Sequence, residues 1–155
     1  MDSQEQPDSK ISEKEEQTIT YANAADLITI PDKIIYYHRG NQTIVDKNNK
    51  FDNILKITKD RASIVKDVSK LAFSQSDIEA LKQNNDVIEY VYLKNVSANW
   101  KYDVNSDFIY RFEYNSIIFP LTGEWNDKAI FLPTSPGPLV PMGSADELIK
   151  VLNQQ

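Results

Sequence analysis

The sequence predicts an α+β domain of two layers, with a mostly antiparallel sheet and helices on one face. Three observations support this class. After residue 50, apolar residues recur at steps of three and four, as on one face of a long helix. Segments 86–95 and 107–121 are rich in β-branched and aromatic residues, which is typical of strands. Short turns link most strands, and strands linked in this way pair antiparallel.

The first half of the domain should contain a β-hairpin, a long helix and a short helix. These elements are expected at residues 34–38, 43–46, 50–70 and 76–85. The stretch "RGNQ" has the glycine and asparagine chemistry of a tight hairpin turn. Asn49 is the expected N-cap of the long helix. Ser76 and Glu79 have the spacing of a capping box at the start of the short helix.

Three or four strands and a terminal helix should complete the domain. The strands are expected at residues 86–95, 107–121 and 128–133, with a loop at 95–106. The pattern of the second strand changes at Asn115 and Ser116, which predicts a bulge or turn there. Ser144 and Glu147 have the spacing of a second capping box, which would open the terminal helix.

The first twenty residues are polar and acidic, and we assign them to a leader in front of a single domain at 21–155. Six acidic residues and two lysines give the leader a net charge of −4, out of −6 for the chain, which leaves −2 for the domain. Such a segment cannot bury enough apolar surface to offset its ordering entropy, so we expect it to be flexible. It is either an ordinary disordered tail or the tether of an exported lipoprotein. In the second interpretation, Asp2 is the first native residue after a removed lipid-modified cysteine.

Composition excludes several classes of function. The chain has no cysteine, which excludes disulfides, thiolate metal sites and a cysteine nucleophile. No stretch approaches the length of a membrane span, and no signal-peptide pattern is present. A nearly neutral domain behind an acidic leader has no electrostatic reason to bind nucleic acid or anionic lipid. Any membrane attachment would therefore be through the lipid anchor alone.

Catalytic and metal-binding signals are weak, so we expect neither an enzyme nor a cofactor. His38 is the only histidine, so a typical zinc site is not expected. It could act as a base only if a carboxylate oriented it and a nucleophile lay near. Asp103, Asn105 and Asp107 have the spacing that opens an EF-hand loop. Phe108 and Tyr114 occupy the positions where that loop needs glycine and glutamate, so we reject the calcium interpretation.

Aromatic residues are the stronger indication of function. Tyrosine and tryptophan favour recognition surfaces, because each combines a large apolar area with one polar atom. Trp100, Tyr102 and Trp125 fall in predicted loops, and we select them as candidate partner-binding residues. The alternative is that they anchor those loops by packing. For the aromatic residues of 108–114 we favour the core.

Three segments of the chain resemble a family of uncharacterised lipoproteins from clostridia and related Gram-positive bacteria. They are "SQSDIEALKQNNDVIEYVYLKN", "IIFPLTGEWNDKAIFL" and "GPLVPMGSADELIKVLN", within residues 74–153. The most specific piece is "FPLTGEW", residues 119–125. The resemblance implies an extracytoplasmic domain anchored to the outer face of the cell membrane, and it brings no activity. More loosely, the order of elements is similar to that of extracytoplasmic regulator domains of cell-wall-stress sensor kinases.

The resulting expectation is a non-enzymatic extracytoplasmic domain that binds a protein or peptide partner at the cell envelope. It would present aromatic loops or a free sheet edge to that partner. The alternative is a small secreted hydrolase that uses His38 with a carboxylate. A third possibility is a module of a larger envelope complex.

Overall fold

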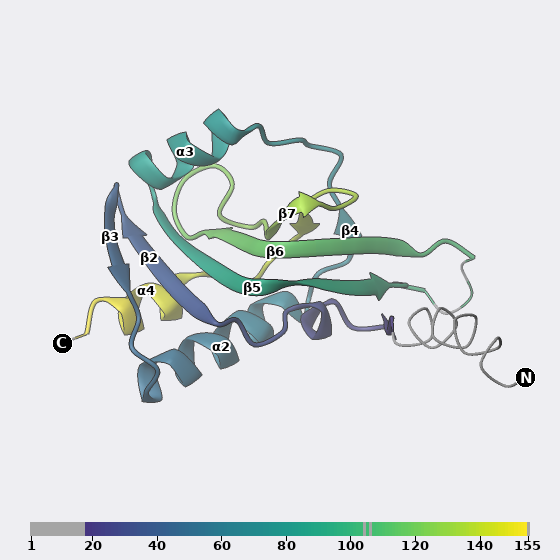
Figure 1. Cartoon of the computed structure of the whole chain (residues 1–155), viewed down its shortest axis with the longest axis horizontal. Helices are drawn as coiled ribbons and strands as arrows, with labels where there is room; N and C mark the ends of the chain where they lie inside the picture. Colours follow the sequence, from purple (N-terminus) through teal and green to yellow (C-terminus); the bar gives the residue numbers. More distant parts are fainter. Residues whose placement is uncertain (1–17, 104, 106, 155) are drawn as a thin grey trace, which may run out of the picture.

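One sheet of six strands organises the described part of the chain. The computed structural model describes residues 18–103, 105 and 107–154. The strands lie in the order β3–β2–β5–β6–β7, and β1 pairs with β5 (Figure 1). Every pairing in this sheet is antiparallel except that of β1 with β5. The bounds are β1 (Thr20–Tyr21), β2 (Lys33–His38), β3 (Asn41–Ile44), β5 (Asp86–Trp100), β6 (Tyr110–Pro120) and β7 (Ile130–Thr134). The predicted α+β class with a mostly antiparallel sheet is confirmed.

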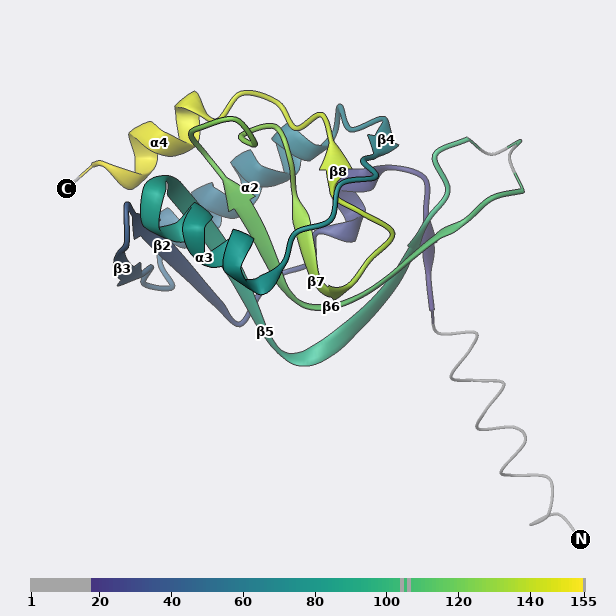
Figure 2. The same ribbon diagram turned by 90° about the horizontal axis from the view of Figure 1, so that it is seen from above.

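Helices cover both faces of the sheet. They are α2 (Asn49–Ala62), α3 (Gln75–Asn84) and α4 (Asp146–Leu152). Figure 1 and Figure 2 show α2 and α4 on one face and α3 on the other. Successive strand residues point to opposite faces, so Tyr36 joins the core under α2, whereas Tyr37 and Val87 pack with Leu81 of α3. The expectation that all helices share one face is therefore corrected for α3, because β2 and β5 are apolar on both faces and need cover on both.

The predicted hairpin is confirmed in β2 and β3. His38 pairs with Asn41, and Ile35 pairs with Ile44. Arg39 and Gly40 form the turn with positive φ values of 47° and 93°. Two such residues match the twist of a two-residue hairpin.

The long helix α2 is shorter than predicted. The N-cap is Asn48 rather than the predicted Asn49, and its side chain accepts a hydrogen bond from the Lys50 N–H at 2.9 Å. The helix ends at Ala62 rather than near residue 70. Val65 lies after the end of the helix, and its side chain is buried in the core. The chain then forms β4 (Asp67–Val68), which pairs with β8 (Leu139–Val140). The apolar spacing continued past the helix because these valines also pack on the core.

Both predicted capping boxes need correction. The N-cap of α3 is Ser74, two residues before the predicted Ser76. Its hydroxyl accepts from the Asp77 N–H at 3.1 Å, and the Ser74 N–H donates to Asp77 Oδ2 at 2.8 Å. Helix α4 begins after Ala145 without a side-chain cap, although the Asp146 N–H donates to Ser144 Oγ at 3.1 Å.

Strand β5 continues through the first part of the predicted loop. It runs to Trp100, and the register of its pairing with β6 shifts between Val91 and Val96. Even-numbered residues face the core under α2 on both sides of this bulge, Tyr90 and Tyr92 before it and Ala98 and Trp100 after it. The bulge predicted in β6 near residue 115 is confirmed, since its register with β7 shifts between Tyr114 and Ser116.

The leader predicted at residues 1–20 lies largely outside the described residues, which begin at Thr18. Thr20 already pairs with Asn99 in the sheet. Among the helices of the described chain, none has the length and hydropathy needed to cross a membrane.

Candidate binding cleft

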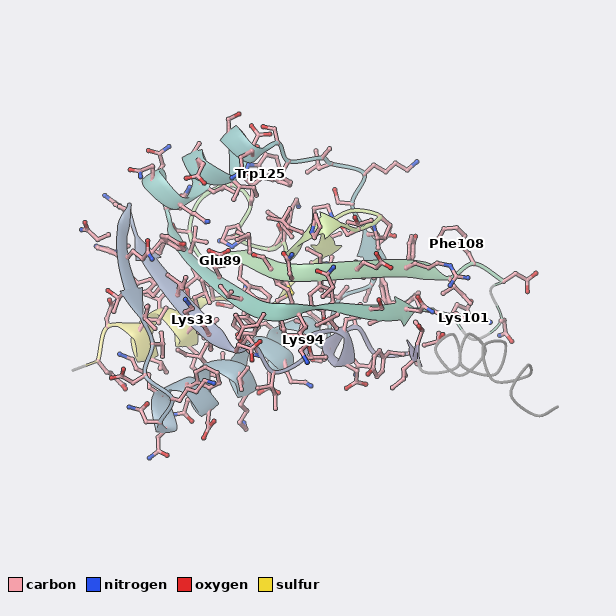
Figure 3. The ribbon with its side chains drawn as sticks, viewed as in Figure 1. Lys33, Glu89, Lys94, Lys101, Phe108 and Trp125 are labelled. Carbon is pink, nitrogen blue, oxygen red and sulfur yellow. The ribbon has the colours of Figure 1, made fainter. Side chains whose placement is uncertain are left out.

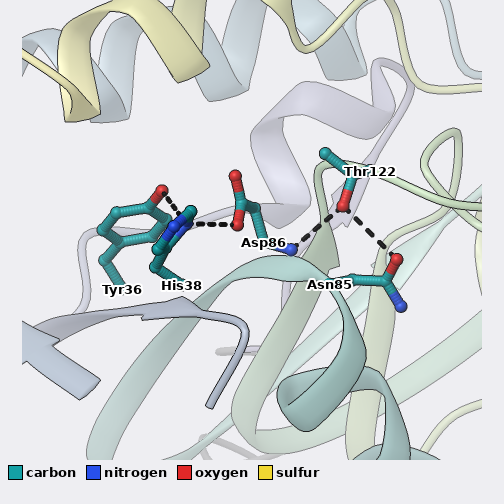
Figure 4. Close-up of polar contacts among 5 residues, drawn as sticks. All are labelled: Tyr36, His38, Asn85, Asp86 and Thr122. Atoms are coloured by element: carbon teal, nitrogen blue, oxygen red, sulfur yellow. Dashed lines mark hydrogen bonds and ion pairs between the residues drawn. The ribbon is translucent and has the colours of Figure 1, made fainter. Parts of the chain in front are cut away.

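A short turn after β6 is fixed to the junction of α3 and β5. The Leu121 N–H donates to the Asp86 carbonyl oxygen at 2.8 Å, and the Asp86 N–H donates to Thr122 Oγ1 at 3.0 Å. The Thr122 hydroxyl donates in turn to Asn85 Oδ1 at 3.3 Å (Figure 4). Three hydrogen bonds therefore fix the position of residues 121–125 beside the end of α3.

Gly123 makes the close approach of this turn possible. Its φ of +86° lies in the left-handed region, and the side chain of Asn85 occupies the space that a Cβ at Gly123 would fill. Asn85 is the C-cap of α3, where its N–H donates to the Leu81 carbonyl at 3.0 Å. The sequence Thr-Gly therefore directs the next two residues, Glu124 and Trp125, toward α3.

Trp125 and Phe73 form an aromatic pair beside α3. Their ring centroids are 5.6 Å apart and their planes are perpendicular. Phe73 immediately precedes the Ser74 N-cap, so the start of α3 fixes its position. On Trp125, the Lys128 ammonium lies 5.5 Å from the ring centroid, and it is also 3.1 Å from Asp127 Oδ1. Both aromatic side chains are half-buried, which leaves part of their surface available to a ligand.

These elements enclose a cleft of about 420 Å³, which we call the Trp125 cleft. Its apolar lining consists of Leu71, Ala72, Phe73, Ala80, Leu81 and Trp125. Its polar lining consists of Asp77, Asn84, Asn85 and Glu124. None of the described residues that line it is basic. An apolar side chain could be buried there, and a neighbouring cation would meet carboxylate and amide oxygens.

The two carboxylates of the cleft differ in their hydrogen bonding. Asp77 accepts the capping hydrogen bond from Ser74. Glu124 is exposed and has no hydrogen-bond partner within the described chain. Glu124 is thus the acidic group most accessible to a basic ligand.

His38 meets a carboxylate close to the same turn. His38 Nδ1 lies 2.7 Å from Asp86 Oδ1 and 3.4 Å from the Tyr36 hydroxyl (Figure 4). The His38 side chain is 57% exposed and that of Asp86 is 12% exposed. Burial, followed by the charge of Asp86, raises the pKa of Tyr36 to about 12. Within the part of the chain that the structure describes, the His38 ring has hydrogen-bond partners at Nδ1 only, so no hydroxyl nucleophile contacts Nε2.

A half-buried polar cluster fastens α3 to the sheet. Glu89 Oε1 accepts from the Tyr37 hydroxyl at 2.8 Å and lies 3.1 Å from Lys82 Nζ of α3, while Oε2 accepts from Ser116 Oγ at 2.9 Å. Glu89 is labelled in Figure 3. The Lys82 ammonium also lies 4.8 Å from the centroid of the Tyr37 ring. Burial, followed by the hydrogen bond and charge of Glu89, raises the pKa of Tyr37. This cluster sets the position of the helix that forms one side of the cleft.

The three aromatic residues selected from the sequence have different environments. Trp100 is fully buried, and its Nε1 donates to the Ala22 carbonyl at 3.1 Å, so it is a core residue rather than a surface one. Tyr102 is 54% exposed and packs on Trp100 with ring centroids 5.8 Å apart. Trp125 lines the cleft. The structure therefore brings Trp100 and Tyr102 together and places Trp125 in a separate site.

The residues with calcium-like spacing lie between β5 and β6. The Asn105 N–H donates to Asp103 Oδ1 at 3.0 Å. In the described ranges, no group of three or more histidine, aspartate or glutamate side chains is placed to hold a metal ion.

Sequence reasoning missed Phe73, Asp77, Asn85 and Glu124 as parts of a site. One local signal was present, because Gly123 directly precedes an acidic and an aromatic residue in a turn. The partner of that turn, α3, is set by tertiary packing and has no local signal.

Comparison of the chain with known protein families, with curated proteins and with solved structures finds no match. The resemblance of residues 74–153 to a lipoprotein family therefore stays a prediction. The geometry of the Trp125 cleft is therefore the basis for a functional assignment.

Proposed function

We propose that this protein is a non-enzymatic binding domain that recognises a protein or peptide partner through the Trp125 cleft. The observation that supports this most is the combination of an aromatic pair, Phe73 and Trp125, with carboxylate and amide oxygens and no basic lining residue among those described. The ligand with complementary chemistry is an apolar side chain flanked by lysine or arginine.

A peptide fits this cleft better than a sugar does. A sugar would stack on an open face of the indole ring. The Lys128 ammonium lies over Trp125 at 5.5 Å from its centroid, and the edge contact with Phe73 occupies a further part of the ring. An apolar side chain can instead enter between the ring edge and the aliphatic residues Leu71 and Leu81, with no need for a free ring face.

Selection from a short random-peptide library tests this proposal. Immobilised wild-type protein should enrich peptides that carry an aromatic or aliphatic residue next to a basic one. Trp125→Ala should reduce the affinity for the enriched peptides about tenfold or more, as expected for a central aromatic contact. Tyr102→Ala is the matched control, because it removes an exposed aromatic residue outside the cleft, and it should leave binding unchanged. Absence of enrichment, or equal binding to Trp125→Ala, would contradict the proposal.

We further propose that the domain works at the outer face of a cell membrane, tethered by its polar leader. The composition of residues 1–20 and the family resemblance support this. The test is the intact mass of the N-terminus of the native protein. A lipid-modified cysteine before Asp2 supports the tether, and an unmodified N-terminus in a cytoplasmic fraction contradicts it.

The hydrolase remains a second candidate because of one observation, the 2.7 Å contact between His38 and Asp86. A carboxylate at Nδ1 is the arrangement that orients a histidine base. If the protein is a hydrolase, His38→Ala should abolish turnover of ester and peptide probes by the wild type. If it is a binding domain, His38→Ala should leave the affinity for library-selected peptides within about twofold, since exposed substitutions change little.

A further inference from the structure

A second, smaller cavity of about 240 Å³ adjoins the Trp125 cleft, and we call it the Pro138 cavity. Residues 71–73 line both cavities and form their common wall. The remaining lining of the Pro138 cavity comes mainly from β7 and the loop after it, residues 130–133 and 135–138. Figure 2 shows the chain between β4 and α3 passing beside β7. Leu132 of this cavity and Trp125 of the cleft pack against the same cluster of buried residues, so both cavities lie on the α3 face of the sheet.

The two cavities carry opposite charges. The lining of the Pro138 cavity is mostly apolar and includes Leu132 and three prolines. Lys70 is the single charged residue among the described residues that line it. Lys70 is exposed and forms no ion pair within the described chain. The Trp125 cleft instead has the carboxylates of Asp77 and Glu124. Each cavity therefore suits an apolar side chain, but the charge that is favoured beside it differs between the two.

An exposed apolar ridge separates the two cavities, and we call it the Leu71 ridge. Leu71 is 41% exposed, and Ala72 next to it is also exposed. Exposed apolar residues that continue an apolar cavity are typical of a contact surface. Three residues of extended chain span about 10 Å, so a peptide that fills both cavities needs only about two to four residues between its anchors. A helix needs a continuous groove for its apolar face, and the ridge interrupts the groove, so an extended segment fits better.

Hydrogen bonds fix both ends of the Leu71 ridge. The Ser69 N–H donates to the Pro138 carbonyl at 2.8 Å, and the Leu71 N–H donates to Ser69 Oγ at 3.1 Å. At the other end, the Ser74 N–H donates to Asp77 Oδ2 at 2.8 Å, within the cap of α3. The wall between the cavities is therefore formed before a ligand binds, and little conformational entropy would be lost on binding.

We propose that the ligand of this protein is an extended peptide with two apolar anchors, which crosses the Leu71 ridge and fills both cavities. A basic residue accompanies the anchor in the Trp125 cleft, and an acidic residue accompanies the anchor in the Pro138 cavity, beside Lys70. The second anchor is the smaller side chain, because its cavity has about 240 Å³ and the cleft about 420 Å³. The inference rests on the proposed function, since the first anchor is the side chain already assigned to the Trp125 cleft.

Charge reversal at Lys70 tests the second anchor. Peptides selected on the wild type should carry a second apolar residue beside an acidic one, about two to four residues from the apolar and basic pair. Lys70→Glu should reduce their affinity about fivefold, because attraction at the rim becomes repulsion, and added salt should shrink the difference. Lys66→Glu is the matched control, because Lys66 is an exposed lysine that lies before β4 and lines neither cavity. It should bind the same peptides within about twofold of the wild type.

Changes in the peptide give the decisive measurement. Replacing the acidic residue of a selected peptide with lysine should restore its binding to Lys70→Glu and weaken its binding to the wild type. A truncated peptide that keeps only the apolar and basic half should bind the wild type and Lys70→Glu equally. Binding of the truncated peptide also shows that Lys70→Glu is folded.

The outcomes separate this inference from the proposed function. Selected peptides without a second anchor, or equal affinity of the wild type and Lys70→Glu for the full peptides, would overturn the ligand with two anchors. If those peptides still require Trp125, the proposed function stands and only the second anchor is wrong. If no peptide is enriched, both fail.

Discussion

Gly123 lies so close to Asn85 that the side chain of Asn85 fills the space a Cβ would need. Together with the positive φ of Gly123, this contact predicts that Gly123→Ala is unfavourable. We expect a loss of about 1–3 kcal/mol in the free energy of unfolding, from backbone strain and from displacement of Asn85. Urea unfolding would measure the loss, and a change in tryptophan fluorescence that disappears in a Trp125→Phe background would report the displaced turn.

Gly143→Ala is the matched control for this prediction. Gly143 has an ordinary φ, and a Cβ there would meet its nearest neighbour, the Arg61 Cα, at 3.4 Å. Gly143→Ala should reduce the free energy of unfolding by less than about 1 kcal/mol. Equal losses for the two variants would show that the approach of Gly123 to Asn85 is not a constraint.

Among the acidic residues near the surface, Glu89 should cause the largest loss in the free energy of unfolding when it is replaced. Glu89→Ala leaves Tyr37, Lys82 and Ser116 without their common acceptor, and we expect a loss of about 2–4 kcal/mol. The exposed pair of Lys56 and Asp60, 3.6 Å apart on α2, is the comparison. Lys56→Ala should change stability by less than about 0.5 kcal/mol. Urea unfolding of both variants decides whether the Glu89 cluster fastens α3.

Trp100 and Tyr102 are neighbours, but their substitution should reduce the free energy of unfolding by very different amounts. Trp100→Ala removes a fully buried indole ring and its hydrogen bond, so we expect a loss of about 3–5 kcal/mol. Tyr102→Ala removes a side chain that is 54% exposed, and its cost should be below about 1 kcal/mol. Thermal unfolding of the pair checks this. A mild effect at Trp100 would mean that it is not part of the core.

Alkaline pH should unfold the protein cooperatively. Burial is the main cause that raises the pKa of Tyr90, Tyr92 and Tyr114 above the ordinary value of 10. Above pH 10 the unfolded chain releases these protons while the native state keeps them, so the free energy of unfolding falls as pH rises. Each tyrosine contributes about 1.4 kcal/mol per pH unit in that range, and its contribution is fully present below pH 10. Tyrosinate absorbance should therefore rise together with the loss of circular dichroism.

Tyr90→Phe and Tyr114→Phe form a matched pair for the alkaline prediction. The Tyr90 hydroxyl is buried near Thr58 and Arg61 but makes no hydrogen bond of ordinary geometry in the described chain, so its removal should cost less than about 1 kcal/mol at neutral pH. The Tyr114 hydroxyl donates to the Leu27 carbonyl at 2.6 Å, and its loss should cost about 1–2 kcal/mol. In both variants, the free energy of unfolding should fall less steeply above pH 10 than in the wild type. An unchanged slope would contradict the raised pKa values.

The fold class was largely predictable because local patterns and tertiary structure agree in α2, β2, β3 and β6. Local patterns and tertiary structure disagree where the same apolar spacing occurs in a helix and in the non-helical segment that follows it. Val65 and Val68 keep the spacing of a helix although the chain there is no longer helical. The largely exposed stretch 93–97 interrupts the apolar pattern of β5, so the strand that carries Trp100 looked like a loop. The apolar faces of β5 required cover on both sides, but the sequence did not indicate which helix lies on which face.

The site was less predictable than the fold. Trp125 was found because an aromatic residue in a turn is conspicuous. Phe73, Asp77 and Asn85 acquire a role only when α3 packs on the sheet beside that turn. Exposed apolar residues such as Leu93, which is 80% exposed, are indistinguishable in sequence from strand residues that face the core.

The walls of the cleft come from segments that meet only in the folded sheet. Asp86 and Thr122, which join them, are 36 residues apart in the chain. The segment before Phe73 is fixed by the Ser69 N–H, which donates to the Pro138 carbonyl at 2.8 Å. The cleft therefore depends on contacts between segments that are distant in the chain. A ligand that binds the cleft should in turn stabilise these contacts against unfolding.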